Sequence, residues 1–170
     1  MKNLFGIVLL ALGSFFLMGS SPTTEKYRCL PCGQTCDETL WDSPGKCAKC
    51  HMELVKASTI SFKHTDPASI CSYIKSHPNT ILLDVRTKNE FLGNAEPNFG
   101  TLKNAINIPI QELNDRMAEL KAYKNKDILV YCSHSHRSPQ AAYLLTQNGF
   151  AHIINMDGGM SQVTASGCKK

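Results

Sequence analysis

The chain contains the stretch Ile128-Leu129-Val130-Tyr131-Cys132-Ser133-His134-Ser135-His136-Arg137-Ser138-Pro139. Its apolar residues predict a short buried strand, and the polar residues after Cys132 predict a tight loop. We expect a helix to follow, with Ser138 as its N-cap and Pro139 at its first helical position. Strand, loop and helix in this order indicate that Cys132 lies at the carboxyl edge of a sheet in an α/β fold.

The same loop predicts a reactive thiolate at Cys132. Backbone N–H groups of the loop and the positive end of the following helix favour negative charge on the sulfur, and Arg137 adds a fixed cation. The alternative is a buried structural cysteine, which is common because free cysteines are among the most buried residues. The polar loop and Arg137 favour the reactive interpretation.

The first residues have the pattern of a secretory signal peptide over positions 1–21. Lys2 precedes an apolar stretch from Leu4 to Met18, and small residues follow it. The stretch is short for a membrane span, so we expect cleavage and an exported protein, periplasmic or secreted. The alternative is an uncleaved N-terminal anchor, and only that alternative places the protein on a membrane.

Length and charge limit the classes of function. The chain has 170 residues and a formal net charge of +4. Without the signal, this length suits one ordinary domain and a small appendage. The basic residues do not form a stripe with interleaved aromatic residues, so we expect no nucleic-acid partner.

Five of the eight cysteines lie within residues 27–56. Two CxxC pairs predict a closed tetrahedral zinc site, since each pair presents two sulfur atoms to one ion. The predicted ligands are Cys29, Cys32, Cys47 and Cys50. Cys36 and His51 are additional donors that would replace a ligand or bind a second, softer metal. An exported location favours the alternative, a knot of disulfides.

This cysteine-rich segment resembles the short heavy-metal-binding domain of bacterial metal-handling proteins. The resemblance rests on Tyr27-Arg28-Cys29 and on Pro44-Gly45-Lys46-Cys47-Ala48-Lys49-Cys50-His51-Met52-Glu53-Leu54. It implies a small N-terminal module that a metal holds together. A segment of this length buries too little apolar surface to fold without such a constraint.

The chain beyond a polar linker at residues 57–65 alternates helix and strand patterns over residues 66–166. The expected strands are 81–85, 105–108, 127–131 and 152–155, and the expected helices begin at 67, 110 and 138. Such alternation with short loops predicts a parallel sheet covered by helices on both faces.

This region resembles a rhodanese domain. Its motifs occur in the order Leu83-Asp84-Val85-Arg86 with Glu90-Phe91, Ala105-Ile106-Asn107-Ile108-Pro109, Val130-Tyr131-Cys132 with Arg137-Ser138, and Asp157-Gly158-Gly159. The resemblance implies a sulfurtransferase in which Cys132 carries a persulfide. It further implies that the loop residues Ser133, His134, Ser135 and His136 cradle that persulfide, with Ser138 beside them. Family loops often have glycine where Ser135 stands.

The remaining site residues have narrower expected roles. Arg137 would hold the sulfonate of a small anionic donor such as thiosulfate. His134 and His136 either contribute charge and proton transfer or are exposed polar residues. Asp84 and Arg86 are expected to orient strand and loop ends through ion pairs.

Three functions remain open. The first is sulfur transfer from thiosulfate or a similar donor to a thiol or cyanide, without a cofactor for the transfer itself. The second is a non-catalytic metal-handling protein whose rhodanese-like domain binds sulfide or a partner. The third is a thiol-redox sensor in which Cys71 or Cys168 resolves Cys132. Phosphatase activity is not expected, because only four residues separate Cys132 from Arg137.

Overall fold

The computed structural model describes residues 24–170. The predicted signal peptide at positions 1–21 lies outside these residues. Across positions 24–170, no helix has both the length and the apolar character needed to cross a membrane.

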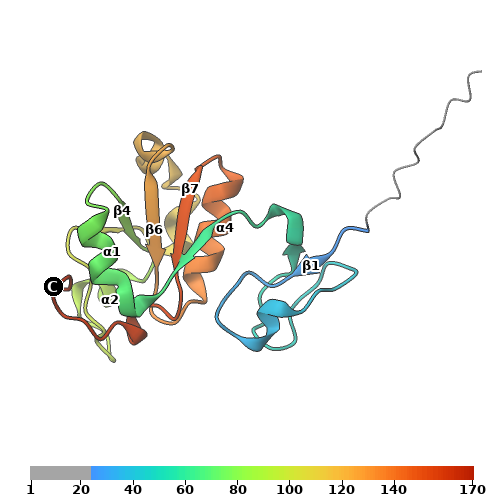
Figure 1. Cartoon of the computed structure of the whole chain (residues 1–170), viewed down its shortest axis with the longest axis horizontal. Helices are drawn as coiled ribbons and strands as arrows, with labels where there is room; N and C mark the ends of the chain where they lie inside the picture. Colours follow the sequence, from blue (N-terminus) through green and yellow to red (C-terminus); the bar gives the residue numbers. More distant parts are fainter. Residues whose placement is uncertain (1–23) are drawn as a thin grey trace, which may run out of the picture.

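A five-stranded sheet forms the centre of the larger part of the molecule (Figure 1). Its strands, in the spatial order β3-β7-β6-β4-β5, all run parallel to their neighbours. They are β3 Lys63–Thr65, β4 Ile81–Asp84, β5 Ile106–Asn107, β6 Asp127–Tyr131 and β7 His152–Met156. The predicted α/β class with a parallel sheet is confirmed.

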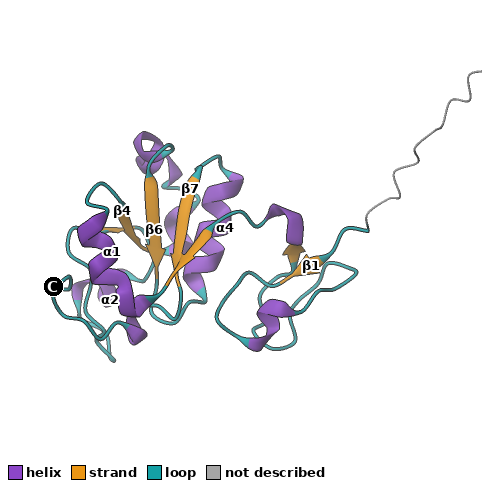
Figure 2. Cartoon of the chain, viewed as in Figure 1, coloured by secondary structure: helices purple, strands orange, loops and turns teal. Residues whose placement is uncertain are grey.

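Helices cover both faces of this sheet (Figure 2). They are α1 Ile70–Ser76, α2 Lys88–Leu92, α3 Ile110–Leu113 and α4 Arg137–Gln147, with 3-10 helices at Pro67–Ser69, Met117–Tyr123 and Met160–Gln162. Successive residues of β6 point to opposite faces. Ile128 and Val130 therefore pack in the core that contains Leu145 of α4, and Leu129 packs in the core that contains Ile70 of α1.

Two predicted boundaries differ from the structure. The predicted helix from residue 110 ends at Leu113, and a 3-10 helix begins at Met117; Asn114 and Asp115, which are poor helix formers, lie between them. The predicted linker contains β3 and a 3-10 helix, Ala57–Thr59. Because β3 is an edge strand with exposed polar side chains, it lacks the apolar pattern of a buried strand. The predicted domain limits stay a prediction.

The cysteine-rich module packs beside α4 (Figure 1). Its chain is closed by a two-stranded antiparallel sheet of β1, Tyr27–Arg28, and β2, Val55–Lys56. The apolar side chains of Leu30, Met52 and Leu54 belong to the same buried cluster as Leu145 of α4. The module is therefore attached to the sheet domain through shared apolar burial.

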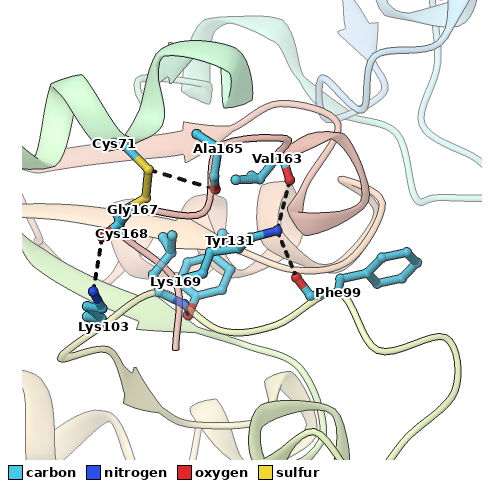
Figure 3. The surroundings of a disulfide bond; sticks show 10 residues. Cys71, Phe99, Lys103, Tyr131, Val163, Ala165, Gly167, Cys168 and Lys169 are labelled. Carbon is cyan, nitrogen blue, oxygen red and sulfur yellow. Dashed lines mark hydrogen bonds between the residues drawn. A yellow bond between two sulfur atoms is a disulfide. The ribbon is translucent and has the colours of Figure 1, made fainter.

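A disulfide joins Cys71 of α1 to Cys168 near the end of the chain, across 97 residues of sequence (Figure 3). The chain beyond Val163 then runs against residues 101–103. There, the N–H of Lys170 donates to the carbonyl of Thr101 at 2.8 Å, and the N–H of Lys103 donates to that of Cys168 at 2.9 Å. The C-terminal segment is thus fastened both covalently and by backbone hydrogen bonds.

Candidate functional site

Cys132 directly follows the last residue of β6 and is 1% exposed. The loop 133–136 leads from it to α4, which begins at Arg137 with His136 as its N-cap. The expectation that Ser138 is the N-cap is therefore wrong, because the helix begins earlier and takes Ser138 into its first turn. Ser138 is buried there, with its Oγ 3.5 Å from the Sγ of Cys132.

The loop depends on a left-handed backbone conformation at Ser135. This residue has φ of 57° and is fully buried, which explains why glycine would suit the position. The side-chain amide of Asn155 lies 3.4 Å from its Oγ. Among residues 24–170, no backbone carbonyl accepts a hydrogen bond from the N–H groups of positions 133–136. Four backbone donors beside Cys132 are therefore available to an anion.

The turn at Gly159 packs directly against the loop. The N–H of Met160 donates to the carbonyl of Cys132 at 2.8 Å, and the N–H of Ser161 donates to that of Ser133 at 3.0 Å. A Cβ at position 159 would lie 2.5 Å from the carbonyl carbon of Ser133. Only glycine allows this approach, so the turn fixes the direction of the carbonyls of Cys132 and Ser133.

Glu90 anchors the other side of the loop. Its carboxylate accepts hydrogen bonds from the two terminal guanidinium nitrogens of Arg137, each at 2.7 Å, and from the Oγ of Ser133 at 2.8 Å. The hydrogen bonds from Arg137 hold the pKa of Glu90 well below its ordinary value, and Glu90 raises the pKa of Arg137. The cation expected to hold a donor is thus bidentately paired.

Sequence reasoning left Glu90 out of the site, although one local pattern indicates its position. Thr87 and Glu90 form a capping box at the start of α2, in which each side chain binds the backbone of the other. This box fixes the carboxylate at the helix start, where it meets Arg137 from α4. The pairing itself has no local signal, because Arg137 is 47 residues away in sequence.

Asp84 and Arg86 form a buried ion pair at the end of β4, at 2.7 Å. Burial opposes the charge of Arg86, but the hydrogen bond from its guanidinium to Asp84 raises its pKa. Arg86 also donates to the carbonyl of Gly100 and to the Oγ1 of Thr101, each at 3.0 Å. The pair therefore holds the chain at Gly100 and Thr101 in place. None of its hydrogen bonds reaches Cys132.

His134 and His136 are exposed on the outer side of the loop. The ring of His134 meets the ring of Phe99 edge-on, with centroids 5.3 Å apart. The carbonyl of His136 accepts a hydrogen bond from Gln140 of α4. The interpretation of both residues as exposed polar positions fits this placement.

The module brings together four sulfur atoms, all within 4.8 Å of one another. They belong to Cys29, Cys36, Cys47 and Cys50. A tetrahedral site with Zn–S bonds of about 2.3 Å requires sulfur atoms about 3.8 Å apart, and the sulfur atoms of Cys29 and Cys50 lie 3.7 Å apart. This cluster could hold a metal ion.

Three of the predicted ligands, Cys29, Cys47 and Cys50, lie in this cluster, and its fourth member is Cys36, which was named as a donor that would replace a ligand or bind a second metal. Cys32 lies with Cys36 and Asp37 instead of in the four-sulfur cluster. The carboxylate of Asp37 accepts hydrogen bonds from the backbone of Cys32 and Gly33, which holds that knuckle, while the 3-10 helix Thr35–Glu38 presents Cys36. His51 is exposed and has no place in either group.

The four thiols of the cluster differ in their pKa. Burial raises the pKa of Cys29 and of Cys36. Burial acts in the same direction on Cys47, but hydrogen bonds from the backbone of Cys50 and from Cys29 outweigh it and lower the pKa of Cys47 to about 6. All four cysteines are free thiols in the structure, which has no disulfide within residues 27–56.

The redox-sensor alternative does not fit the remaining cysteines. Cys71 and Cys168 are bonded to each other, whereas Cys132 is free. Neither is therefore available as a resolving thiol for Cys132 in this state.

Similar proteins share the sheet domain. An uncharacterized protein of Bacillus subtilis, YqhL, is 38% identical over 81 residues, which are 48% of this chain and 58% of that protein. A sulfurtransferase of Allochromatium vinosum is 30% identical over 95 residues, which are 56% of this chain and 81% of that protein. A tRNA uridine(34) hydroxylase of Buchnera aphidicola is 27% identical over 107 residues, which are 56% of this chain but 32% of that protein.

The chain is also similar to solved structures of rhodanese-like proteins. A rhodanese-related protein of Thermoplasma volcanium has a TM-score of 0.51 at 31% identity, over 62% of this chain and 94% of that one. A rhodanese-like domain from Anabaena has a TM-score of 0.53 at 28% identity, over 64% of this chain and 78% of that one. Residues 72–166, more than half of the chain, match the rhodanese-like domain, and the protein therefore belongs to the rhodanese-like family.

Proposed function

We propose that this protein is a sulfurtransferase that moves sulfane sulfur through a persulfide on Cys132. The donor is thiosulfate or a similar small anion, and the acceptor is a thiol or cyanide. One observation carries the proposal: Cys132 lies at the end of a buried strand, beside four loop N–H groups that make no backbone hydrogen bond within residues 24–170. The sulfurtransferase among the relatives supports it.

The proposed reaction has two displacement steps. The Cys132 thiolate attacks the outer sulfur of thiosulfate, the sulfur–sulfur bond breaks, and sulfite leaves with the electron pair. An acceptor thiolate or cyanide then attacks the outer sulfur of the persulfide, and Cys132 leaves as a thiolate. Neither step requires an external oxidant or reductant.

The loop supplies what these steps need. Its N–H groups and the start of α4 stabilise negative charge on the persulfide. The Ser138 hydroxyl, 3.5 Å from the sulfur, is positioned to donate a hydrogen bond to the thiolate. Arg137 and Glu90 act as positioning residues, because their charges are paired with each other.

A thiosulfate-to-cyanide assay tests the proposal. We expect the wild type to form thiocyanate and Cys132→Ser to form none above background. Cys32→Ser is the matched control, since Cys32 lies in the module and outside the four-sulfur cluster. Equal thiocyanate formation by wild type and Cys132→Ser would exclude Cys132 as the nucleophile.

A second function, metal binding by the module, is favoured by the four-sulfur cluster. We propose zinc as the ion, because four thiolates at tetrahedral spacing suit it. Zinc content of protein purified under reducing conditions should fall in Cys36→Ser and stay near that of the wild type in Cys32→Ser. If zinc content instead falls in Cys32→Ser and not in Cys36→Ser, the ligands are the two CxxC pairs. Tight metal binding without turnover on several donors would favour a metal-handling protein.

We propose an exported location as well. The residue pattern from Leu4 to Met18 supports it, and so does the Cys71–Cys168 disulfide, because disulfides persist in oxidising compartments. Fractionation of cells that express the full chain tests this, with recovery in the cytoplasm as the contrary outcome.

A further inference from the structure

A hollow beside the persulfide loop has no role in the chemistry described so far. Its volume is about 410 Å³, within the usual range for small-ligand pockets. Its lining includes Phe99, Met160, Ser161, Lys169 and Lys170. Arg137 is already paired with Glu90. An anionic donor therefore needs another cation, and the lysines of this hollow are candidates.

The lining residues contact the loop directly. Met160 and Ser161 donate their N–H groups to the carbonyls of Cys132 and Ser133, at 2.8 and 3.0 Å. Phe99 packs edge-on against His134, with ring centroids 5.3 Å apart. Three residues that line the hollow therefore contact Cys132 or the loop after it.

The two lysines are held by contacts other than carboxylates. The Nζ of Lys169 donates to the carbonyl of Val163 at 3.0 Å and approaches that of Phe99 at 3.5 Å, which fixes its position and leaves a third donor (Figure 3). The Nζ of Lys170 lies 4.6 Å from the ring centroid of Phe91. Among residues 24–170, neither lysine forms an ion pair with an Asp or Glu side chain.

The disulfide holds these lysines in place. Cys168 is bonded to Cys71, and the next two residues are Lys169 and Lys170. Backbone hydrogen bonds between Lys170 and Thr101 complete the attachment. A charged tail that is fixed before binding loses less conformational entropy when an anion binds.

We propose that this hollow binds the anionic group of the sulfur donor, with Lys169 and Lys170 as its positive charges. The inference rests on the proposed sulfur transfer. The shared chemistry is a sulfonate or carboxylate attached to a sulfane sulfur, as in thiosulfate or a small organic persulfide. With an organic persulfide, Cys132 attacks the outer sulfur, the sulfur–sulfur bond breaks, and the organic thiolate leaves with the electron pair.

Kinetics of Lys169→Gln, Lys170→Gln and the double variant test this subsite with three donors. These are thiosulfate, glutathione persulfide and the diethyl ester of glutathione persulfide, which lacks the carboxylates. We expect KM for the anionic donors to rise about three- to tenfold in the double variant, with kcat nearly unchanged. A larger rise of KM for thiosulfate would indicate that the hollow binds a sulfonate, and a larger rise for glutathione persulfide would indicate a carboxylate. KM for the ester should not change.

The matched control is Lys124→Gln. Lys124 is also an exposed lysine over an aromatic ring, that of Phe150, but it precedes β6 and lies away from the carboxyl end that carries Cys132. Equal KM values for Lys124→Gln and the double variant would overturn the proposal. A KM rise for the ester as large as for the anions would do the same, since it would indicate a structural effect.

Equilibrium binding separates this inference from the proposed function. Thiosulfate binding to Cys132→Ser, which cannot turn over, is measured by calorimetry with and without the two lysine substitutions. Weaker binding after the substitutions supports the subsite even if the wild type transfers no sulfur. Unchanged binding refutes the subsite even if the wild type is an active sulfurtransferase.

Discussion

Two backbone positions shape the loop 133–136 after Cys132. Ser135 adopts a left-handed conformation although it has a side chain, and Gly159 approaches the loop closely enough to exclude a Cβ. Both positions act through the main chain: the carbonyls of Cys132 and Ser133 bind the turn after Gly159, while the N–H groups of positions 133–136 have no backbone acceptor within residues 24–170. The site is thus determined as much by backbone geometry as by side-chain chemistry.

Gly159→Ala should disrupt this geometry. The new Cβ would lie 2.5 Å from the carbonyl carbon and oxygen of Ser133, and neither backbone atom can move alone. We expect a loss of about 1–3 kcal/mol in the free energy of unfolding and a large loss of thiocyanate formation. Urea unfolding and the thiosulfate assay measure the two effects.

Gly167→Ala is the control for that substitution. Gly167 lies in the same C-terminal part of the chain, but a Cβ there would meet nothing within 4 Å. Similar losses in both variants would show that close approach at Gly159 is not the cause.

At the scale of elements, the site depends on the contact between α2 and α4. The capping box of α2 fixes Glu90, and Glu90 in turn binds Arg137 at the start of α4. Because both side chains are about one-quarter exposed or less, this pair is screened less by solvent than a surface pair. It connects the end of β4 with the loop after β6.

Glu90→Gln should make stability less dependent on acid pH. The pKa of Glu90 is lowered in the folded protein, so its contribution is complete above the unfolded pKa of about 4.3 and is lost as pH falls below that value. The wild type should therefore exceed the variant by about 1–2 kcal/mol at pH 7 and by less at pH 3. Urea unfolding at both pH values measures the difference.

Glu119→Gln provides the comparison. Glu119 also pairs with an arginine, Arg116, but on the surface of the molecule. We expect its substitution to change stability little at either pH. A pH-independent difference between wild type and Glu90→Gln would show that the charge of Glu90 does not matter for stability.

At the scale of the whole molecule, the disulfide joins parts that are distant in sequence. It connects α1 with the C-terminal segment on the sheet face that contains Leu129 and Met156. The tail then covers residues 101–103, where Tyr131 accepts a hydrogen bond from the N–H of Leu102. The tail is thereby part of the packing around the strand that carries Cys132.

Removal of the disulfide by Cys71→Ala with Cys168→Ala should lower the free energy of unfolding by about 2–4 kcal/mol. The cross-link restricts the unfolded chain over a loop of 97 residues. Urea unfolding without reductant measures this loss. Dithiothreitol should destabilise the wild type to a similar extent and leave the double variant unchanged; an equal effect on both would point to other thiols.

The amino-acid sequence by itself determined the main strands and the position of Cys132 in the fold. The apolar run over residues 127–131 is a local pattern, and β6 forms where this pattern predicts a strand. A local pattern suffices for this strand because its burial follows from its own apolar residues. It did not suffice for the start of α4, which begins at Arg137 with His136 as its N-cap. The placement of Cys132 at the carboxyl edge of the sheet follows from the end of β6.

Only the tertiary structure decided which distant side chains meet. It paired Arg137 with Glu90, placed Cys36 instead of Cys32 in the four-sulfur cluster, and joined Cys71 to Cys168. It also added the polar edge strand β3, which pairs with β7. These contacts depend on the packing of segments far apart in the chain, and no local periodicity specifies such packing.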